Sequence, residues 1–241
     1  MKRKKRMSRL SALLLALPLF LLSSPLQADV YVYDMVAIQG EEVRLKAETR
    51  GTLFIRGGEI VEFFVDDIPL GKNLSGGDGV AYRSYRAARP GLKEIRAVSR
   101  NETGRAALLV AKRGAGIVAV DVEGALLQGG FMSPGRPGSR QAVESLANRH
   151  PLVYLQTGET HRRAVRAWLA QNEYADAPLL PWDGGALFDD LAKKGLKIRS
   201  VVGAPAVIES ALKHKPQCFS FEPAKGAVRL KSWEELGEKM K

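Results

Sequence analysis

The stretch GIVAVDVEGALL, residues 116–127, decides the fold of the second half of the chain. It opens with an unbroken apolar run, as in a strand of a parallel sheet that is covered on both faces. The run ends at Asp121, and Glu123 and Gly124 follow it. An acid in this position either does chemistry at the end of a strand or only begins a polar turn. Residues further along the chain decide between the two interpretations.

Short apolar runs alternate with helical patterns from residue 114 to the end of the chain. The expected strands are 116–121, 151–157, 197–203 and 217–222, with a short apolar piece at 177–182. The expected helices are 139–149, 161–171, 185–194, 206–214 and a last one opened by a capping box at Ser232 and Glu235. Ser139 is the expected N-cap of the first helix. This alternation predicts a three-layer α/β domain with a parallel sheet over residues 114–241.

The first half of the chain has the two-residue period of strands. Val43, Leu45 and Ala47 alternate with Arg44 and Lys46, which is typical of a half-buried strand. Similar runs, separated by turn residues, occupy 30–38, 41–48, 51–57, 59–67, 79–87, 91–100 and 106–112. These short strands predict a β-sandwich over residues 29–113. Because the two halves differ in period, we expect two separate cores joined by a short linker.

Four short motifs stand out within the sandwich segment. They are Val65–Asp67, Leu70–Gly71, Tyr82–Tyr85 and Pro90–Gly91. In this order they resemble bacterial immunoglobulin-like modules, over roughly residues 30–112. The resemblance implies a module that binds, spaces or stabilises, and that offers a surface to a protein partner. Asp66 and Asp67 are interpreted as turn residues rather than as a pair of calcium ligands.

Residues 1–28 have the features of a targeting segment. Six Lys or Arg residues and no acid come first, an apolar stretch from Leu13 to Leu22 follows, and small residues lead to Ala28. This order is typical of a secretory signal peptide, and the apolar stretch is shorter than the roughly 20 residues of a spanning helix. We therefore expect cleavage after Ala28, export to the periplasm and no transmembrane span in the mature chain. An uncleaved membrane anchor is the alternative.

Cleavage after Ala28 can be tested directly. Mass spectrometry of the exported protein should find an N-terminus at Asp29. An intact N-terminus recovered in a membrane fraction would instead identify the segment as an anchor.

Charge and cysteine content narrow the classes of function. The whole chain has a formal net charge of +11, but six of its basic residues lie in residues 1–28, so the remainder carries +5. That remainder has no basic block, which argues against nucleic acid as a partner. The single Cys218 cannot form an internal disulfide, and within an expected strand it is interpreted as a small buried hydrophobe.

The candidate site residues lie at the ends of the expected strands of the α/β half, where the working loops of a parallel sheet lie. They are Asp121 and Glu123, then Thr157 and Gly158, then Gly203 and Ala204, then Glu222. The segments VAVDVEGALL and YLQTGETHRRAVRAWL resemble the first two motifs of the haloacid-dehalogenase-like superfamily of phosphohydrolases, in the form found in lipin-type phosphatidate phosphatases. The resemblance spans residues 116–241.

The resemblance implies a phosphatase site. Asp121 would attack phosphorus and form an aspartyl-phosphate, and Glu123 would act as the acid and base. Thr157 and Gly158 would bind the phosphoryl oxygens at a helix N-terminus. Mg²⁺ would be held by the Asp121 carboxylate and the backbone carbonyl of Glu123. The implied substrate is a phosphate monoester on a small molecule or a lipid.

The chain departs from the family pattern in the first, third and fourth motifs. Glu123 replaces the usual Asp, and Ala125 replaces the usual Thr. Candidates for the family's lysine are Lys193, Lys194 and Lys197, and the acids of the fourth motif are replaced by Ala204 and Ala206, with Glu209 and Glu222 as the nearest remaining acids. The expected metal site is therefore degenerate. The segment between Gly124 and the next helix is too short for a cap domain, so that only the sandwich could roof the site.

Two functions remain open from the sequence. One is an exported phosphohydrolase with a degenerate metal site, and the other is an inactive protein of the same fold that acts as a binding or interaction module. Both place Asp121 at the end of the first strand of the parallel sheet, facing Thr157. His161 and Trp182 are candidates for contact with a ligand, although a surface position for His161 and a packing role for Trp182 are preferred.

Overall fold

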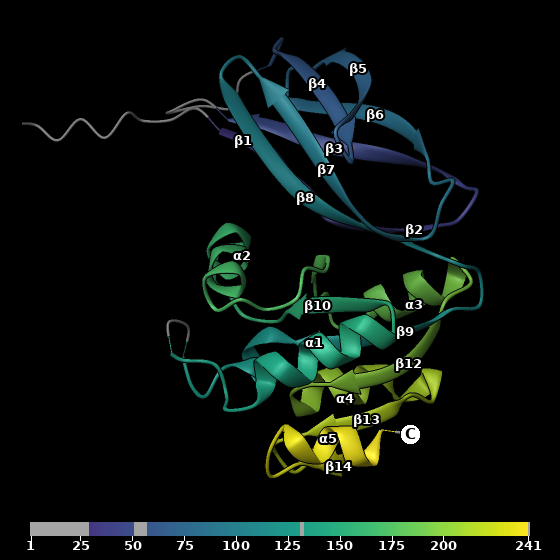
Figure 1. The fold of residues 1–241 in the computed structure, drawn as a ribbon, viewed down its shortest axis with the longest axis vertical. Coiled ribbons are helices and arrows are strands. Elements are labelled where there is room, and N and C mark those ends of the chain that lie inside the picture. The colour runs from purple at the N-terminus through teal and green to yellow at the C-terminus, as the bar shows by residue number, and fades with distance from the viewer. Residues whose placement is uncertain (1–28, 51–56, 131–132, 241) are drawn as a thin grey trace, which may run out of the picture.

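The computed structural model describes residues 29–50, 57–130 and 133–240. The expected signal peptide lies outside these residues, and so does nearly all of the strand expected at 51–57. Figure 1 shows the β-rich half above a layered α/β half, with the chain passing once between them. None of the helices in the described ranges is long and apolar enough to cross a membrane.

The first half is a β-sandwich, as predicted. Its strands are β1 (Asp29–Val32), β2 (Met35–Ile38), β3 (Glu42–Arg50), β4 (Ile60–Val65), β5 (Ile68–Leu74), β6 (Val80–Arg86), β7 (Gly91–Ser99) and β8 (Glu102–Ala111). They form a sheet of order β1-β3-β6 and a second of order β2-β8-β7-β4-β5. Leu45 and Ala47 point between the sheets and share a core with Phe63 and Ile95. The alternation read from β3 therefore identifies its buried face correctly.

Strand β5 was not predicted, because Leu70–Gly71, which lies within it, was interpreted as a turn. Proline is tolerated on an edge strand, where a backbone N–H is not needed for pairing, and β5 is the edge of its sheet. The turn instead lies at Asp66 and Asp67, whose φ angles are 48° and 62°. These two residues join β4 to β5 in a tight hairpin. The interpretation of both acids as turn residues is confirmed.

The second half is an α/β domain, as predicted. Its strands are β9 (Gly116–Asp121), β10 (Leu152–Gln156), β11 (Leu179–Pro181), β12 (Lys197–Val202), β13 (Gln217–Ser220) and β14 (Val228–Arg229), and its helices are α1 (Ser139–Arg149), α2 (Arg162–Gln171), α3 (Ala186–Lys193), α4 (Pro205–Ala211) with a 3₁₀ turn (Leu212–His214), and α5 (Glu234–Lys239). The sheet has the order β11-β10-β9-β12-β13-β14 and all of its pairs are parallel. Numbered along this half, the order is 3-2-1-4-5-6, which is that of a doubly wound sheet.

Helices cover both faces of this sheet. Side chains of α1, α2 and α5 pack on one face, and side chains of α3 and α4 pack on the other. Neighbouring residues of β9, such as Val118 and Ala119, belong to the two different clusters. Burial on both faces explains why β9 is apolar without alternation. Cys218 is buried in β13, in agreement with its interpretation as a small hydrophobe.

Two helix starts differ from the predictions. Gly138, with φ 74°, is the N-cap of α1, and the buried Ser139 hydroxyl lies 2.7 Å from the Tyr174 hydroxyl. Helix α5 begins after Trp233 without a side-chain cap, so the capping box expected at Ser232 is wrong. The Trp233 indole is fully buried and donates to the Ala125 carbonyl at 3.2 Å. Tertiary packing of this large ring therefore decides where the last helix begins.

The prediction of two separate cores is also wrong. Val36 and Ile38 of β2 and Leu109 and Ala111 of β8 belong to the cluster that contains the α3 and α4 side chains. Their sequence neighbours, such as Leu108, point into the sandwich core instead. The second sheet of the sandwich is thus buried on both faces at β2 and β8. The continuous apolar runs of these strands, MVAI and ALLVA, are consistent with burial on both sides.

A buried acid, Asp34, also links the sandwich to the α/β half. Asp34, between β1 and β2, has a side chain that is only 5% exposed. Its Oδ1 accepts from the Ala107 N–H at 2.6 Å, within the sandwich. Its Oδ2 accepts from the Leu179 N–H at 3.0 Å and from the Arg166 guanidinium, both in the α/β half. One carboxylate therefore satisfies donors from both halves.

Candidate functional site

Asp121 lies where the sequence predicted. It is the last residue of β9 and caps a π-helical turn, Val122–Leu126. Strand β9 stands between β10 and β12, at the point where the strand order reverses. In doubly wound sheets, ligands bind at the carboxyl ends of the strands at this point. The position is therefore the expected one for a site.

The Asp121 carboxylate is enclosed by donors of the chain itself. The Gly124 N–H donates to Oδ1 at 3.0 Å, and the Ala204 N–H donates to Oδ2 at 3.0 Å. The Thr157 hydroxyl lies 2.7 Å from Oδ1. The residue is 0% exposed. A methyl group on Gly124 would come within 2.3 Å of Oδ2, so only glycine lets the turn close this tightly on the carboxylate.

Glu123 joins the same cluster. Its Oε2 accepts from the Thr157 N–H at 2.9 Å and lies 3.2 Å from the Thr157 hydroxyl. Its Oε1 is buried and has no hydrogen-bond partner. A Cβ on Gly158 would lie 3.0 Å from that oxygen. The four residues that the resemblance singled out are thus brought together by the ends of β9 and β10.

The hydrogen-bond pattern of the cluster depends on its protonation. The Thr157 hydroxyl has one hydrogen but lies within reach of both carboxyl groups. If Asp121 is protonated, its O–H donates to Thr157, whose own hydrogen then serves Glu123. Burial raises the pKa of Asp121, against the opposing effect of its hydrogen-bond donors. A proton on Asp121 would therefore let the Thr157 hydroxyl bond to both carboxyl groups, although Oε1 of Glu123 would still lack a partner.

The expected cations of a phosphatase site are not beside Asp121. Lys197 is paired with Gly116 at the opposite end of β9. Lys193 contacts Asp190 on its own helix, and Lys194 donates to the Val36 carbonyl of the sandwich. None of the three lysines suggested by the sequence contacts the acids at the carboxyl ends of the strands.

The residues present do not fit Mg²⁺. This ion takes oxygen ligands in octahedral geometry, but both oxygens of Asp121 already accept hydrogen bonds from the chain. Ala204 and Ala206 add no side-chain oxygen, and Glu209 and Glu222 are exposed, with no contact to Asp121. Among the described residues, no group of three or more His, Cys, Asp or Glu side chains could hold a metal.

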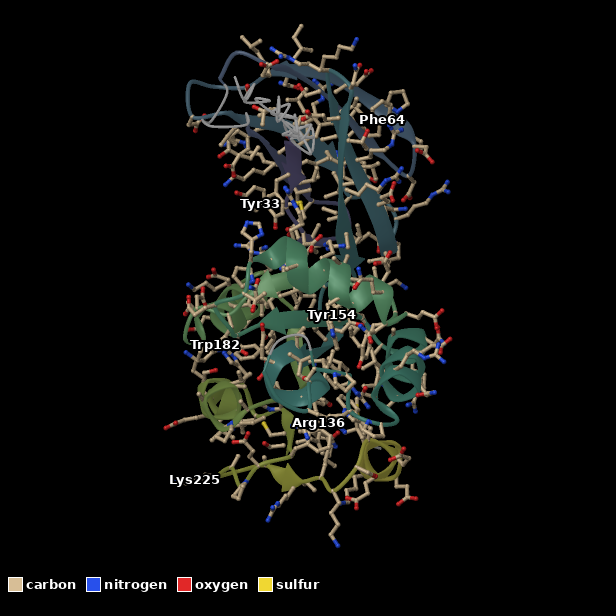
Figure 2. All side chains as sticks on the ribbon, turned by 90° about the vertical axis from the view of Figure 1, so that its left-hand side faces the viewer. Tyr33, Phe64, Arg136, Tyr154, Trp182 and Lys225 are labelled. Atoms are coloured by element: carbon tan, nitrogen blue, oxygen red, sulfur yellow. The ribbon has the colours of Figure 1, made fainter. Side chains whose placement is uncertain are left out.

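A cavity of about 350 Å³ lies beside the loop that contains Thr157. Its lining comes from Tyr31 and Tyr33 of the sandwich and from residues 156–162, Pro181 and Trp182 of the α/β half. Figure 2 shows Tyr33 at the edge of the sandwich that faces the α/β half. The sandwich therefore covers this part of the carboxyl edge of the sheet. Asp121 and Glu123 do not line the cavity.

The preferred interpretations, a surface position for His161 and packing for Trp182, are confirmed, although both residues also line the cavity. His161 is exposed, caps α2 by accepting from the Arg163 N–H at 3.3 Å, and lines the cavity. Trp182 also lines the cavity, and its indole donates to the Ser210 hydroxyl at 3.4 Å. Tyr31, Tyr33 and Arg162 line the same space but were not singled out from the sequence.

Comparisons with known proteins find no family. No family model matches this chain, and no curated protein matches it. Similar solved structures include a proposed membrane anchored protein from Corynebacterium diphtheriae, with 18% identity and a TM-score of 0.32 over 37% of this chain and 22% of that one. Others are fibronectin(III)-like modules of CbhA from Clostridium thermocellum (17%, TM-score 0.26, 34% of this chain and 97% of that one) and an IG27 protein domain (15%, TM-score 0.28, 36% and 99%). Similarity this low carries no argument about function.

Proposed function

We propose that this chain is an exported binding protein whose α/β half has the architecture of a haloacid-dehalogenase-like phosphohydrolase but does not hydrolyse phosphate esters. The observation that carries the proposal is the enclosure of Asp121, which is 0% exposed and hydrogen-bonded through both oxygens. A nucleophilic carboxylate must be ionised and must reach phosphorus. Asp121 is buried, and burial raises the pKa of its carboxyl group, which opposes ionisation.

The surroundings of Asp121 support the same proposal. The donors that would balance phosphate charge are not placed beside it, and the acids that would hold a metal are replaced by alanine. The strand order and the position of Asp121 support a common architecture with phosphohydrolases. Under this proposal the Asp121–Glu123–Thr157 cluster stabilises the ends of β9 and β10, and the sandwich offers a surface for a protein partner.

A phosphate-release assay tests the proposal. The mature protein, residues 29–241, is incubated with a panel of phosphomonoesters and with phosphatidate vesicles, with and without Mg²⁺. We expect release no faster than in a buffer blank, for the wild type and for Glu123→Asp, which restores the usual family residue. Release by the wild type that is lost in a folded Asp121→Asn variant would refute the proposal.

A phosphohydrolase is the second candidate. It is favoured by the convergence of Asp121, Glu123 and Thr157 at the switch point of the sheet. For this function, the π-helical turn would have to open so that Asp121 exchanges its hydrogen bonds to Gly124 and Ala204 for a contact with phosphorus.

A further inference from the structure

Five cations on the strands and turns of the larger sheet of the sandwich, of order β2-β8-β7-β4-β5, are paired with acids. The pairs, with N–O distances between 2.5 and 3.8 Å, are Lys72 with Glu62, Lys93 with Asp66, Arg96 with Asp67, Arg100 with Glu59 and Arg105 with Glu94. A paired cation must leave its own acid before it can bind another. This side of the sandwich therefore offers little free charge to a partner.

The smaller sheet, of β1, β3 and β6, carries a different arrangement. Leu45 points into the sandwich core, so its neighbours Arg44 and Lys46 lie on the outer face of β3. Lys46 stands opposite Tyr82 of β6. On its other side, the backbone N–H of Tyr33 donates to the Lys46 carbonyl at 3.2 Å. A row of tyrosine, lysine and tyrosine therefore crosses this sheet.

Two cations of the outer face lie against tyrosine rings. The Arg44 guanidinium is 4.4 Å from the centre of the Tyr82 ring, and the Lys46 amine is 4.1 Å from the centre of the Tyr33 ring. At these distances the ring attracts the cation. Among the described residues, neither cation has a carboxylate within 4.0 Å. We call these four residues the tyrosine–cation face.

The acids of the smaller sheet lie to either side of these cations. Glu48 is buried and accepts from the Tyr33 hydroxyl at 2.7 Å. Glu42 lies at the start of β3, opposite Arg86 of β6. The charges of Arg44 and Lys46 are therefore held in place by rings, whereas those of the larger sheet are held by carboxylates.

The tyrosine–cation face has the composition of a protein interface. Tyr82 is 40% exposed, and Arg44 is exposed as well. Tyrosine and arginine are enriched at protein interfaces and among the residues that contribute most to binding. A cation already held against a ring loses less conformational freedom on binding. The ring surface that carries the cation is not free to stack on a base, which argues against nucleic acid.

We infer that the tyrosine–cation face binds an acidic protein, whose Asp or Glu carboxylates pair with Arg44 and Lys46. This inference rests on the proposed binding function, and it names the side of the sandwich and the chemistry of the partner. Because residues 29–241 carry a net charge of +5, the partner is a different protein of opposite charge and not a second copy of this chain.

Binding of poly-L-glutamate to the mature protein tests the inference. In about 0.05 M salt, poly-L-glutamate should shift the backbone amide NMR signals of β3 and β6 near Arg44 and Tyr82, and it should leave those of β4 and β5 unchanged. The affinity should fall in about 0.15 M salt, because the screening length becomes shorter. Absence of binding, or shifts centred on another part of the chain, would overturn the inference.

Two double variants that lose the same charge locate the site. Arg44→Gln with Lys46→Gln should weaken binding of poly-L-glutamate by about tenfold or more, as expected for the loss of charge-assisted hydrogen bonds. Lys72→Gln with Arg96→Gln is the matched control, because Arg96 also lies over a ring, 3.8 Å from the centre of Phe64, but is paired with an acid. The control should bind like the wild type. Equal weakening in both double variants would show that only net charge matters, and would overturn a specific face.

Tyr82 tests the contribution of the rings. Tyr82→Phe keeps the ring beneath Arg44 and should bind poly-L-glutamate like the wild type. Tyr82→Ala, checked for folding by its thermal transition, should bind about as weakly as Arg44→Gln. Full affinity in Tyr82→Ala would overturn the role of Tyr82 as a positioning residue for Arg44.

Polygalacturonate distinguishes a protein partner from a polysaccharide, because it carries the same carboxylate groups on a sugar chain. We expect it to bind the wild type more weakly than poly-L-glutamate at the same salt concentration. Tighter binding of polygalacturonate that is lost in the Arg44→Gln, Lys46→Gln variant would assign the face to an acidic polysaccharide and overturn the protein partner.

The test is separate from that of the proposed function. Phosphate release by the wild type but not by Asp121→Asn would refute the binding-only function and leave the binding of poly-L-glutamate to the sandwich in place. Absence of poly-L-glutamate binding would remove the tyrosine–cation face as a docking site and leave the result of the phosphate-release assay unchanged.

Discussion

Replacing Asp121 with alanine should lower the free energy of unfolding by about 2–5 kcal/mol. The change leaves the buried N–H groups of Gly124 and Ala204 without an acceptor and takes a partner from the Thr157 hydroxyl. It also leaves a small void at the end of β9. Urea denaturation of the purified mature protein measures the effect. Asp190→Ala, at an exposed site on α3, serves as the matched control and should change stability by no more than about 0.5 kcal/mol.

The stability of the folded protein should also depend on pH through Asp121. Because the pKa of Asp121 is raised in the folded protein, its contribution to stability is full below the ordinary aspartate pKa and is lost as the pH rises through the raised value. Asp121→Asn cannot titrate, so the wild type should gain stability relative to this variant as the pH is lowered. An unchanged unfolding midpoint in Asp121→Ala would show that the cluster does not stabilise the fold.

Replacing Asp34 with alanine should destabilise the protein by about 2–4 kcal/mol and uncouple its two halves. The change leaves the Ala107 and Leu179 N–H groups without their acceptor and leaves the Arg166 guanidinium unpaired. Arg166 is 31% exposed, so water compensates part of its loss. Scanning calorimetry should show one transition for the wild type and two for the variant.

Asp67→Ala is the control for this variant. Asp67 also pairs with an arginine, Arg96, but its side chain is 82% exposed and the pair lies within the sandwich. Surface pairs of this kind contribute about 0–1 kcal/mol. If Asp34→Ala kept a single transition at the wild-type temperature, the halves would be held together by the apolar cluster of β2 and β8 alone.

The Asp121 cluster could be predicted from the sequence, because parallel strands place the residues that follow them at one edge of the sheet. The meeting of Asp121 with Thr157 follows from the positions of β9 and β10 alone. The enclosure of Asp121 could not be predicted, since it depends on how closely Gly124 and Ala204 approach the carboxylate. A one-dimensional pattern contains no measure of that approach.

The contact between the two halves was not predicted for a related reason. Asp34 lies in a polar break between two apolar strands, as many turn residues do, and only the tertiary structure brings Arg166 to it. The apolar runs of β2 and β8 did signal burial on both faces, but they were assigned to a sandwich with a single core. Tyr31 of β1 and Tyr33, which follows the strand, become a wall of the cavity only because the start of α2 lies opposite them.

The shared apolar cluster also has a kinetic consequence. The sandwich is complete at Ala111, but the side chains that cover the outer faces of β2 and β8 come from α3 and α4, much later in the chain. Strand β9 likewise waits for β12 before it is paired on both sides. Non-local parallel pairing is slow, and an uncovered apolar surface is prone to aggregate while it lasts. The yield of folded protein should therefore depend on how long the outer faces of β2 and β8 stay uncovered before α3 and α4 pack on them.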